Sequence, residues 1–157
     1  MSLPPFQVLL DRHGAAVHRF LVASVGPVDA DDCYQEACIA ALRAYPQLRH
    51  DHGLKSWLFT VASNKAIDFH RARARRPLPV ERVPEQQAPA AATGPDGDDP
   101  VWQQVRELPE KQRAAVFLRS VGDLSYADVA AALGCSQDAA RRSVHEGLKR
   151  LREEVPS

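Results

Sequence analysis

The residues with the clearest chemistry lie in the segment 54–76, LKSWLFTVASNKAIDFHRARARR. Its first half places Leu54, Trp57 and Leu58 at the three- and four-residue spacing of an amphipathic helix. The segment is also basic, because six Lys and Arg side chains oppose only Asp68. A helix with a packed end, an aromatic residue and a cationic end is suited to bind a phosphate backbone. A solvated basic helix end explains the same pattern, so both interpretations stay open here.

A second basic helix is predicted near the C-terminus, after the turn Gly134-Cys135-Ser136, where Ser136 can cap it. Its apolar side chains are Ala140, Val144, Leu148 and Leu151, and its separate basic stripe is Arg141, His145, Lys149 and Arg152. Two helices joined by a short turn with Gly predict a helix-turn-helix, whose second helix enters the major groove. A plain helical hairpin is the alternative, but the positive surplus favours DNA binding.

Acidic and thiol side chains could support other chemistry, but their spacing argues against it. The cluster Asp29, Asp31, Asp32 and Glu36, with scattered histidines, could be imagined as a metal-dependent hydrolase, yet no H-x-x-x-H or paired E-x-x-H spacing supports one. The three cysteines are odd in number and lack a CxxC pair, so the sequence predicts no disulfide and fits a reduced cytoplasm. No metal and no cofactor are expected.

Hydrophobic spacing predicts an all-α fold in two small domains. The first, residues 1–76, is a helical bundle with helices at about 5–25, from an N-cap at Asp29 to Pro46, and at 54–76. Leu42 is predicted to belong to the buried stripe of the second helix. The second domain, residues 101–157, has a short helix near Val101, a helix from about Ala114 to Gly122, a helix capped by Ser125, and the basic helix.

Residues 77–100 are rich in proline and alanine and have no apolar period, which predicts a flexible linker. Five acidic residues oppose one arginine there, so the linker is acidic although the whole chain has zero net charge. No apolar run approaches the roughly 20 residues that a membrane-spanning helix needs. The first residues have no basic start and only a brief apolar run, so no signal peptide is expected.

Four motifs in this order resemble the extracytoplasmic-function (group IV) sigma factors of bacterial RNA polymerase. They are DADDCYQE at 29–36, SWLFTVASNKAID at 56–68, LPEKQR at 108–113 and LSYADVA at 124–130. Each motif alone is weak, but four in order on both sides of a linker form a strong match. The resemblance implies an alternative sigma factor, which is not an enzyme and directs transcription initiation at specific promoters.

The resemblance also implies roles for individual residues. Polymerase binding, on the clamp helices of the largest subunit, falls to Asp32, Gln35 and Glu36. Capture of the melted −10 strand falls to His50, Lys55, Trp57, Asn64, Lys65, Asp68, Arg71, Arg73, Arg75 and Arg76. For Trp57, core packing is as good an explanation as base stacking. Recognition of the −35 duplex falls to Arg141, Arg142, Ser143, His145, Lys149 and Arg150, with the two arginines placed to meet bases.

The basic C-terminal helix departs from the family pattern. Residues 138–144 are DAARRSV where the family commonly has GTVKSRL, and Glu146 stands where a basic residue is common. Gly147 should cost about 1 kcal/mol in a helix interior. These departures leave the promoter sequence open.

The implied partners are core RNA polymerase (including the flap of its second-largest subunit), promoter DNA and an anti-sigma protein that the sequence does not identify. A stand-alone helix-turn-helix regulator is the first rival interpretation, but it leaves the 29–36 and 56–68 motifs unexplained. The metal-dependent hydrolase is the remote one.

Overall fold

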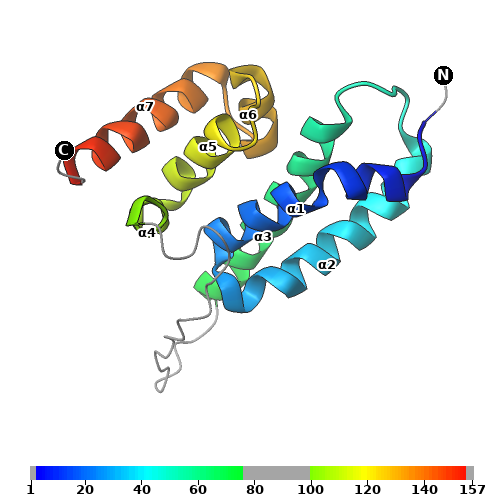
Figure 1. Cartoon of the computed structure of the whole chain (residues 1–157), viewed down its shortest axis with the longest axis horizontal. Helices are drawn as coiled ribbons and strands as arrows, with labels where there is room; N and C mark the ends of the chain where they lie inside the picture. The colour runs from blue at the N-terminus through cyan, green and yellow to red at the C-terminus, as the bar shows by residue number, and fades with distance from the viewer. Residues whose placement is uncertain (1–2, 76–99, 155–157) are drawn as a thin grey trace.

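The computed structural model describes residues 3–75 and 100–154 (Figure 1). Within these residues it has seven α-helices, one short 3-10 turn and no strand, which confirms the predicted all-α fold. The predicted linker, apart from Pro100, lies outside the described residues, and so does the predicted DNA contact Arg76.

The N-terminal helices form a three-helix bundle. They are α1 (Phe6–Val25), α2 (Pro27–Ala44) and α3 (Leu54–Arg75), with the 3-10 turn η1 (Tyr45–Gln47) after α2. Gly26 joins α1 to α2 with φ at 94°, a conformation that favours glycine, and the two helices run back along each other (Figure 1). All three helices pack pairwise, and their shared core includes Leu9, Val17, Leu21, Ala37 and Leu58.

Two details of α2 differ from the prediction. The helix begins at Pro27, so Asp29 lies in its first turn and is not the N-cap; proline suits this position because its fixed φ is already helical. Leu42 is 55% exposed, so its predicted burial is wrong. The buried face of α2 is set by Ala30, Cys33, Ala37 and Ala41, and Leu42 is rotated by about 100° from the last of these.

The C-terminal helices are α4 (Pro100–Glu107), α5 (Glu110–Ser120), α6 (Tyr126–Leu133) and α7 (Gln137–Glu154). The hydroxyl of Ser125 accepts a hydrogen bond from the Asp128 N–H at 3.1 Å, and that of Ser136 accepts one from the Ala139 N–H at 3.0 Å. Gly134, with φ at 71°, ends α6 in the left-handed conformation. Both predicted caps and the helix-turn-helix of α6 and α7 are therefore confirmed.

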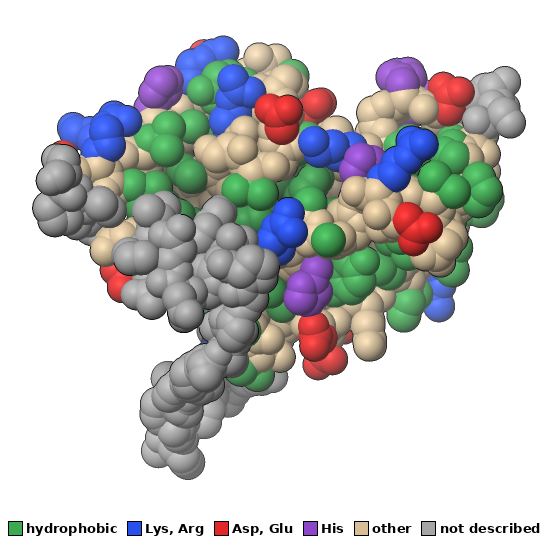
Figure 2. All heavy atoms as spheres, viewed as in Figure 1, with side chains coloured by type: hydrophobic (Ala, Val, Ile, Leu, Met, Phe, Trp, Pro, Cys, Tyr) green, Lys and Arg blue, Asp and Glu red, His purple; other side chains and the backbone are tan. Residues whose placement is uncertain are grey.

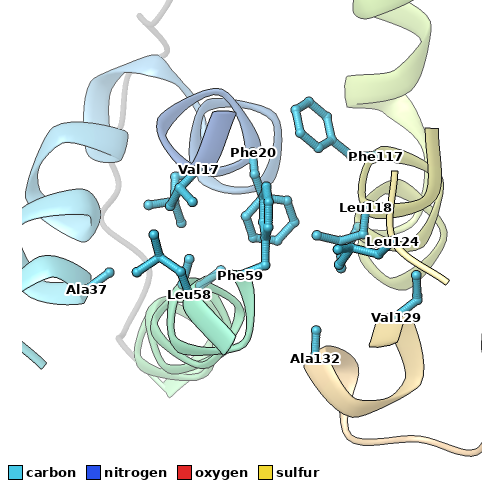
Figure 3. Close-up of a cluster of buried hydrophobic side chains, with 14 of the residues drawn as sticks. Val17, Phe20, Ala37, Leu58, Phe59, Phe117, Leu118, Leu124, Val129 and Ala132 are labelled. Carbon is cyan, nitrogen blue, oxygen red and sulfur yellow. The ribbon is translucent and has the colours of Figure 1, made fainter. Parts of the chain in front are cut away.

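The two groups of helices pack against each other, α1 on α5 and α3 on α6. Figure 3 shows Phe20 of α1 and Phe59 of α3 pointing toward Leu118 and Leu124. The ring of Phe20 lies 5.9 Å from that of Phe59 and 5.7 Å from that of Phe117 in α5. Apolar side chains of both groups thus form one continuous core.

Polar contacts at the end of α1 join the same two groups. The carbonyl oxygen of Ser24 accepts hydrogen bonds from His70 Nε2 at 3.0 Å and from the Arg113 guanidinium at 3.1 Å. His70 Nε2 also lies 3.8 Å from a carboxylate oxygen of Glu110, and Arg113 donates to the carbonyl oxygen of Arg106 at 2.9 Å. The cationic guanidinium of Arg113 suits a helix C-terminus, where carbonyl oxygens lack partners and carry the negative end of the dipole.

Candidate nucleic-acid interface

The helix α3 has two distinct faces. Phe59, Ser63 and Ala66 are buried, and the predicted strand-binding residues lie elsewhere on the helix. Asn64, Asp68, Arg71 and Arg75 follow one another at spacings of four, three and four, and all are exposed. They form a continuous polar stripe along about three turns, because residues three and four apart are neighbours on a helix. Lys65 is half-buried beside this stripe.

Trp57 lies in the packed part of α3. Its ring is half-buried and its centroid is 6.0 Å from that of Tyr45, whose hydroxyl donates to the Pro4 carbonyl oxygen. Packing is therefore one role of Trp57, and base stacking remains a prediction that the half-exposed ring permits. The hydrogen bond from Tyr45 to Pro4 holds the residues before α1 against η1, which precedes the loop before α3.

The loop before α3 carries His50 and His52. His50 Nδ1 lies 2.7 Å from the His52 carbonyl oxygen, and the two rings are 4.8 Å apart. Nearby, burial lowers the pKa of His13, and the charges of Lys55 and Arg12 lower it further. His13 therefore lies within the electrostatic reach of Lys55, one of the predicted strand-binding residues. No group of three or more metal-ligating side chains lies close enough to hold a metal ion in the described parts of the chain.

Arg73 differs from the other α3 arginines because it contacts the protein itself. Its guanidinium lies 3.9 Å from a carboxylate oxygen of Asp29 and 5.9 Å from the centroid of the Phe69 ring. The Arg73 side chain is 59% exposed, so the ion pair is solvated and contributes little to stability. It can exchange this partner for a phosphate without a buried charge being left behind.

The predicted polymerase-binding residues share an exposed face of α2. Asp32, Gln35 and Glu36 are exposed, and Ile39 and Leu42 continue the same face at 51% and 55% exposure. Val28, at 74%, begins it. Large exposed apolar side chains in a row next to acidic ones are typical of a protein-binding surface. The sequence prediction missed Ile39 and Leu42, although their spacing of four and seven from Gln35 already places them on its side of the helix.

The helix α7 presents its basic side chains to solvent. Ala140, Val144 and Gly147 are buried against the helices beneath. Of the predicted DNA contacts, Ser143 is half-buried and the others are exposed, namely Arg141, Arg142, His145, Lys149 and Arg150. Figure 2 shows blue Lys and Arg side chains along the edge that α7 occupies in Figure 1.

Gly147 is explained by the packing of α7. A Cβ atom at this position would lie 2.5 Å from Cγ2 of Val116 and 3.4 Å from Cβ of Gln112, both in α5. The glycine therefore allows α7 to approach α5 closely, and its low helix propensity is the local cost of that approach. The departure from the family pattern at this residue concerns packing rather than DNA contact.

Arg141 is ordered by contacts at the start of α7. Its guanidinium lies 4.8 Å from the centroid of the Tyr126 ring and 3.4 Å from a carboxylate oxygen of Asp138. The guanidinium of Arg119, from α5, lies 4.6 Å from the same ring. No sequence pattern indicates this cluster, because its residues come from three helices.

Two family descriptions match the chain. Residues 9–76 match Sigma-70 region 2, and residues 98–151 match Sigma-70, region 4. The ECF RNA polymerase sigma factor SigD of Mycobacterium tuberculosis is 36% identical over 154 residues, which cover 88% of this chain and 71% of SigD. The ECF RNA polymerase sigma-E factor of Escherichia coli is 26% identical over 164 residues, covering 96% of this chain and 86% of that protein.

A solved structure has the same arrangement of helices. The sigma factor RpoE of Bartonella quintana, in complex with the anti-sigma factor NepR, superposes with a TM-score of 0.74 at 25% identity and covers 94% of each chain. Over the ranges that the structure describes here, no helix is both long and apolar enough to cross a membrane.

Proposed function

Since the chain belongs to the extracytoplasmic-function sigma factors of bacterial RNA polymerase, we propose that it binds core polymerase and directs initiation at a specific set of promoters. The observation that carries this proposal is the match of both sigma regions, in order, on either side of the linker. A stand-alone helix-turn-helix regulator leaves the match over residues 9–76 without a purpose. This family is not a class of enzymes, so no catalytic residue is assigned.

Docking on polymerase is assigned to the exposed face of α2. Asp32, Gln35 and Glu36 would contact the clamp helices of the largest subunit, as the family resemblance implies. The exposure of Ile39 and Leu42 supports an extension of this surface toward the end of α2, because a partner helix would remove both side chains from water. The acidic residues would then set the orientation and the apolar ones would supply buried area.

Capture of the melted −10 strand is assigned to the polar stripe of α3 and the loop before it. The stripe offers an amide, a carboxylate and two guanidiniums to base edges and phosphates, and the loop offers His50 and Lys55. The half-exposed ring of Trp57 could support one unstacked base, since stacking on an aromatic side chain is worth about 1–3 kcal/mol per base. Arg73 would join this surface by leaving Asp29.

Recognition of the −35 duplex is assigned to α7. Arg141 and Arg142 lie in its first two turns, where the second helix of a helix-turn-helix meets base edges. His145, Lys149 and Arg150 would contact phosphates, which position the helix without reading sequence. The flap of the second-largest polymerase subunit is the proposed partner of the remaining surface of this domain.

Binding both promoter elements requires the two helix groups to separate. Elements centred 25 base pairs apart are about 85 Å apart along B-form DNA, at about 3.4 Å per base pair. A compact chain of this length has a radius of gyration of only about 15 Å. The 24 residues from 77 to 100 could span at most about 80 Å when fully extended, so their length matches this task.

An anti-sigma protein is a further proposed partner, because the similar RpoE of Bartonella quintana is described in complex with the anti-sigma factor NepR. Since the proposed target is RNA polymerase bound to promoter DNA, we place the activity in the cytoplasm. The arrangement of Figure 1, with both helix groups in contact, is the form that we expect away from polymerase.

Transcription with purified core polymerase tests the proposal. The chain should confer initiation on promoters selected from random DNA with the reconstituted holoenzyme, and a stand-alone regulator could not. The double variant Asp32→Lys and Glu36→Lys should lower affinity for core polymerase about tenfold or more, which corresponds to about 1.4 kcal/mol or more. Ile39→Ser with Leu42→Ser should weaken binding without loss of stability, since both side chains are exposed in the free chain.

A matched control separates the docking assignment from net charge. The double variant Asp11→Lys and Glu107→Lys changes the charge equally at two exposed acidic residues outside α2, in α1 and α4. It should bind core polymerase as the unmodified chain does. Equal loss in both double variants would contradict the α2 assignment, and no binding by the unmodified chain would refute the function itself.

A further inference from the structure

Two guanidinium groups from neighbouring helices lie against the ring of Tyr126. Arg119 comes from the last turn of α5 and Arg141 from the first turns of α7, with the two guanidinium carbons 4.6 Å and 4.8 Å from the ring centroid. Distances below about 6 Å are those of favourable cation–π contacts. Tyr126 itself is the first residue of α6, so the cluster lies where all three helices meet.

Hydrogen bonds fix the backbone around Tyr126, both in the first turn of α6 and in the residues just before it. The Ser125 hydroxyl caps α6 by accepting from the Asp128 N–H, which fixes the first turn of the helix. The Arg119 guanidinium donates to the Leu124 carbonyl oxygen at 2.9 Å, so the residue before the cap is fixed too. Tyr126 is half-buried, and one arginine already rests against it independently of α7. It is therefore a rigid support rather than a mobile surface ring.

The position of the Arg141 side chain depends more on the Tyr126 ring than on the ion pair with Asp138. The contact with Asp138 is 3.4 Å long, and the two side chains are 46% and 88% exposed. An exposed pair of this kind is weak and does not fix a long side chain. The aromatic face restricts the plane of the guanidinium as well as its place, and a guanine is read by a planar, two-pronged contact.

We propose that Tyr126 is a positioning residue for −35 recognition, holding the Arg141 guanidinium in the orientation that reads a base pair. This inference rests on the proposed role of Arg141 in the major groove. Arranging the side chain before DNA arrives removes part of the conformational entropy that binding would otherwise cost. Discrimination at the base pair read by Arg141 should therefore depend on the aromatic ring of residue 126 and not on its hydroxyl.

The test compares base-pair discrimination in the complete holoenzyme. The upstream element is obtained by selecting random DNA with core polymerase and the full chain, and each base pair is then varied in competition binding. Tyr126→Leu should reduce discrimination roughly 2- to 5-fold at the base pair where Arg141→Ala also reduces it, the size expected for one exposed cation–π contact. Tyr126→Phe should keep it, and in the Arg141→Ala background Tyr126→Leu should add nothing at that base pair.

A control variant guards against an effect of stability alone. Leu133→Ala removes a half-buried side chain that packs on the core at the other end of α6, seven residues from Tyr126. It should lower the midpoint of unfolding without a loss confined to one base pair. If Tyr126→Leu weakens binding to all sequences equally, or if Tyr126→Phe loses as much discrimination as Tyr126→Leu, the positioning role is refuted.

A second measurement separates this inference from the proposed function. In nuclear magnetic resonance spectra of the full free chain, the Arg141 side-chain signals should carry a ring-current shift that Tyr126→Leu removes and Tyr126→Phe keeps. Absence of that shift overturns the positioning role whatever Arg141 does on DNA. A normal shift together with no base-specific loss in Arg141→Ala would instead refute Arg141 as a base reader, and with it the functional use of the contact.

Discussion

The close packing of α7 against α5 can be tested by substituting Gly147. Glycine in a helix interior is about 1 kcal/mol less favourable than alanine, so propensity alone predicts that Gly147→Ala stabilises the chain. The structure predicts the opposite, because the new methyl group would lie 2.5 Å from Cγ2 of Val116. Val116 is 5% exposed and β-branched within a helix, so it cannot turn away easily.

The magnitude follows from these two opposing effects. Forcing an extra methyl group into a packed interface typically costs about 1–3 kcal/mol. Subtracting the gain in propensity leaves a net destabilisation of about 0–2 kcal/mol for Gly147→Ala. When Val116→Ala has first removed the obstructing methyl, the same substitution should stabilise by up to about 1 kcal/mol. The sign of the effect should therefore reverse between the two backgrounds.

The assay is a double-mutant cycle read by urea unfolding. The four proteins are the unmodified chain, the two single variants and the double variant, and the coupling energy should be about 1–3 kcal/mol in favour of the double. A stabilising Gly147→Ala in the unmodified background would refute the close approach of α7 to α5. So would additive effects, because they would show that residues 116 and 147 do not share space.

Two further predictions concern Arg113 and the cysteines. Arg113→Met should destabilise the chain by about 1.5–3 kcal/mol in urea unfolding, because the Ser24 and Arg106 carbonyl oxygens lose charged donors; exposed Lys111→Met is the control and should stay within about 0.5 kcal/mol. With a thiol reagent at pH 8, exposed Cys135 should react in a fast phase that Cys135→Ser abolishes, and Cys33 and Cys38 should react slowly until urea unfolds the chain. Burial raises the pKa of Cys33, and the negative charge of Glu36 raises it further. Burial also raises the pKa of Cys38, although a hydrogen bond with Tyr34 acts in the opposite direction. At pH 8 a smaller fraction of both thiols is therefore in the reactive thiolate form than for a free cysteine. Three fast thiols in the folded chain would contradict the packing of α2.

The sequence predicted those parts of the fold that depend on neighbouring residues. The caps at Ser125 and Ser136 were predictable because a hydroxyl and the N–H three residues later form the whole motif. Leu42 was misplaced because apolar spacing identifies a helix but does not say which face its neighbours cover. The contact between Phe20 and Phe117 could not be predicted, since the two residues are 97 positions apart in the sequence and no local pattern links them.

The same division applies to the candidate site. Exposure of the α3 stripe and of the α7 arginines could be predicted, because charged residues spaced along a helix indicate a solvated face. Their roles came from the family resemblance and stay predictions. The ordering of Arg141 by Tyr126 was not visible, since it requires the crossing of α6 and α7 to be known. Gly147 appeared as a defect in the sequence because its partner, Val116, lies on another helix.

The shared core also has an energetic consequence for the proposed function. Phe20, Phe59 and Phe117 are 1%, 0% and 3% exposed, and separating the helix groups would uncover part of each ring. Fully exposing one such side chain costs about 1.5–3 kcal/mol, so partial exposure of several makes separation unfavourable by a few kcal/mol in the free chain. Under the proposed function, polymerase would have to supply that free energy through its contacts with both groups. The free chain should therefore bind paired promoter elements poorly, and the proposed dependence on polymerase would follow from packing as well as from the placement of the two helices proposed to bind DNA.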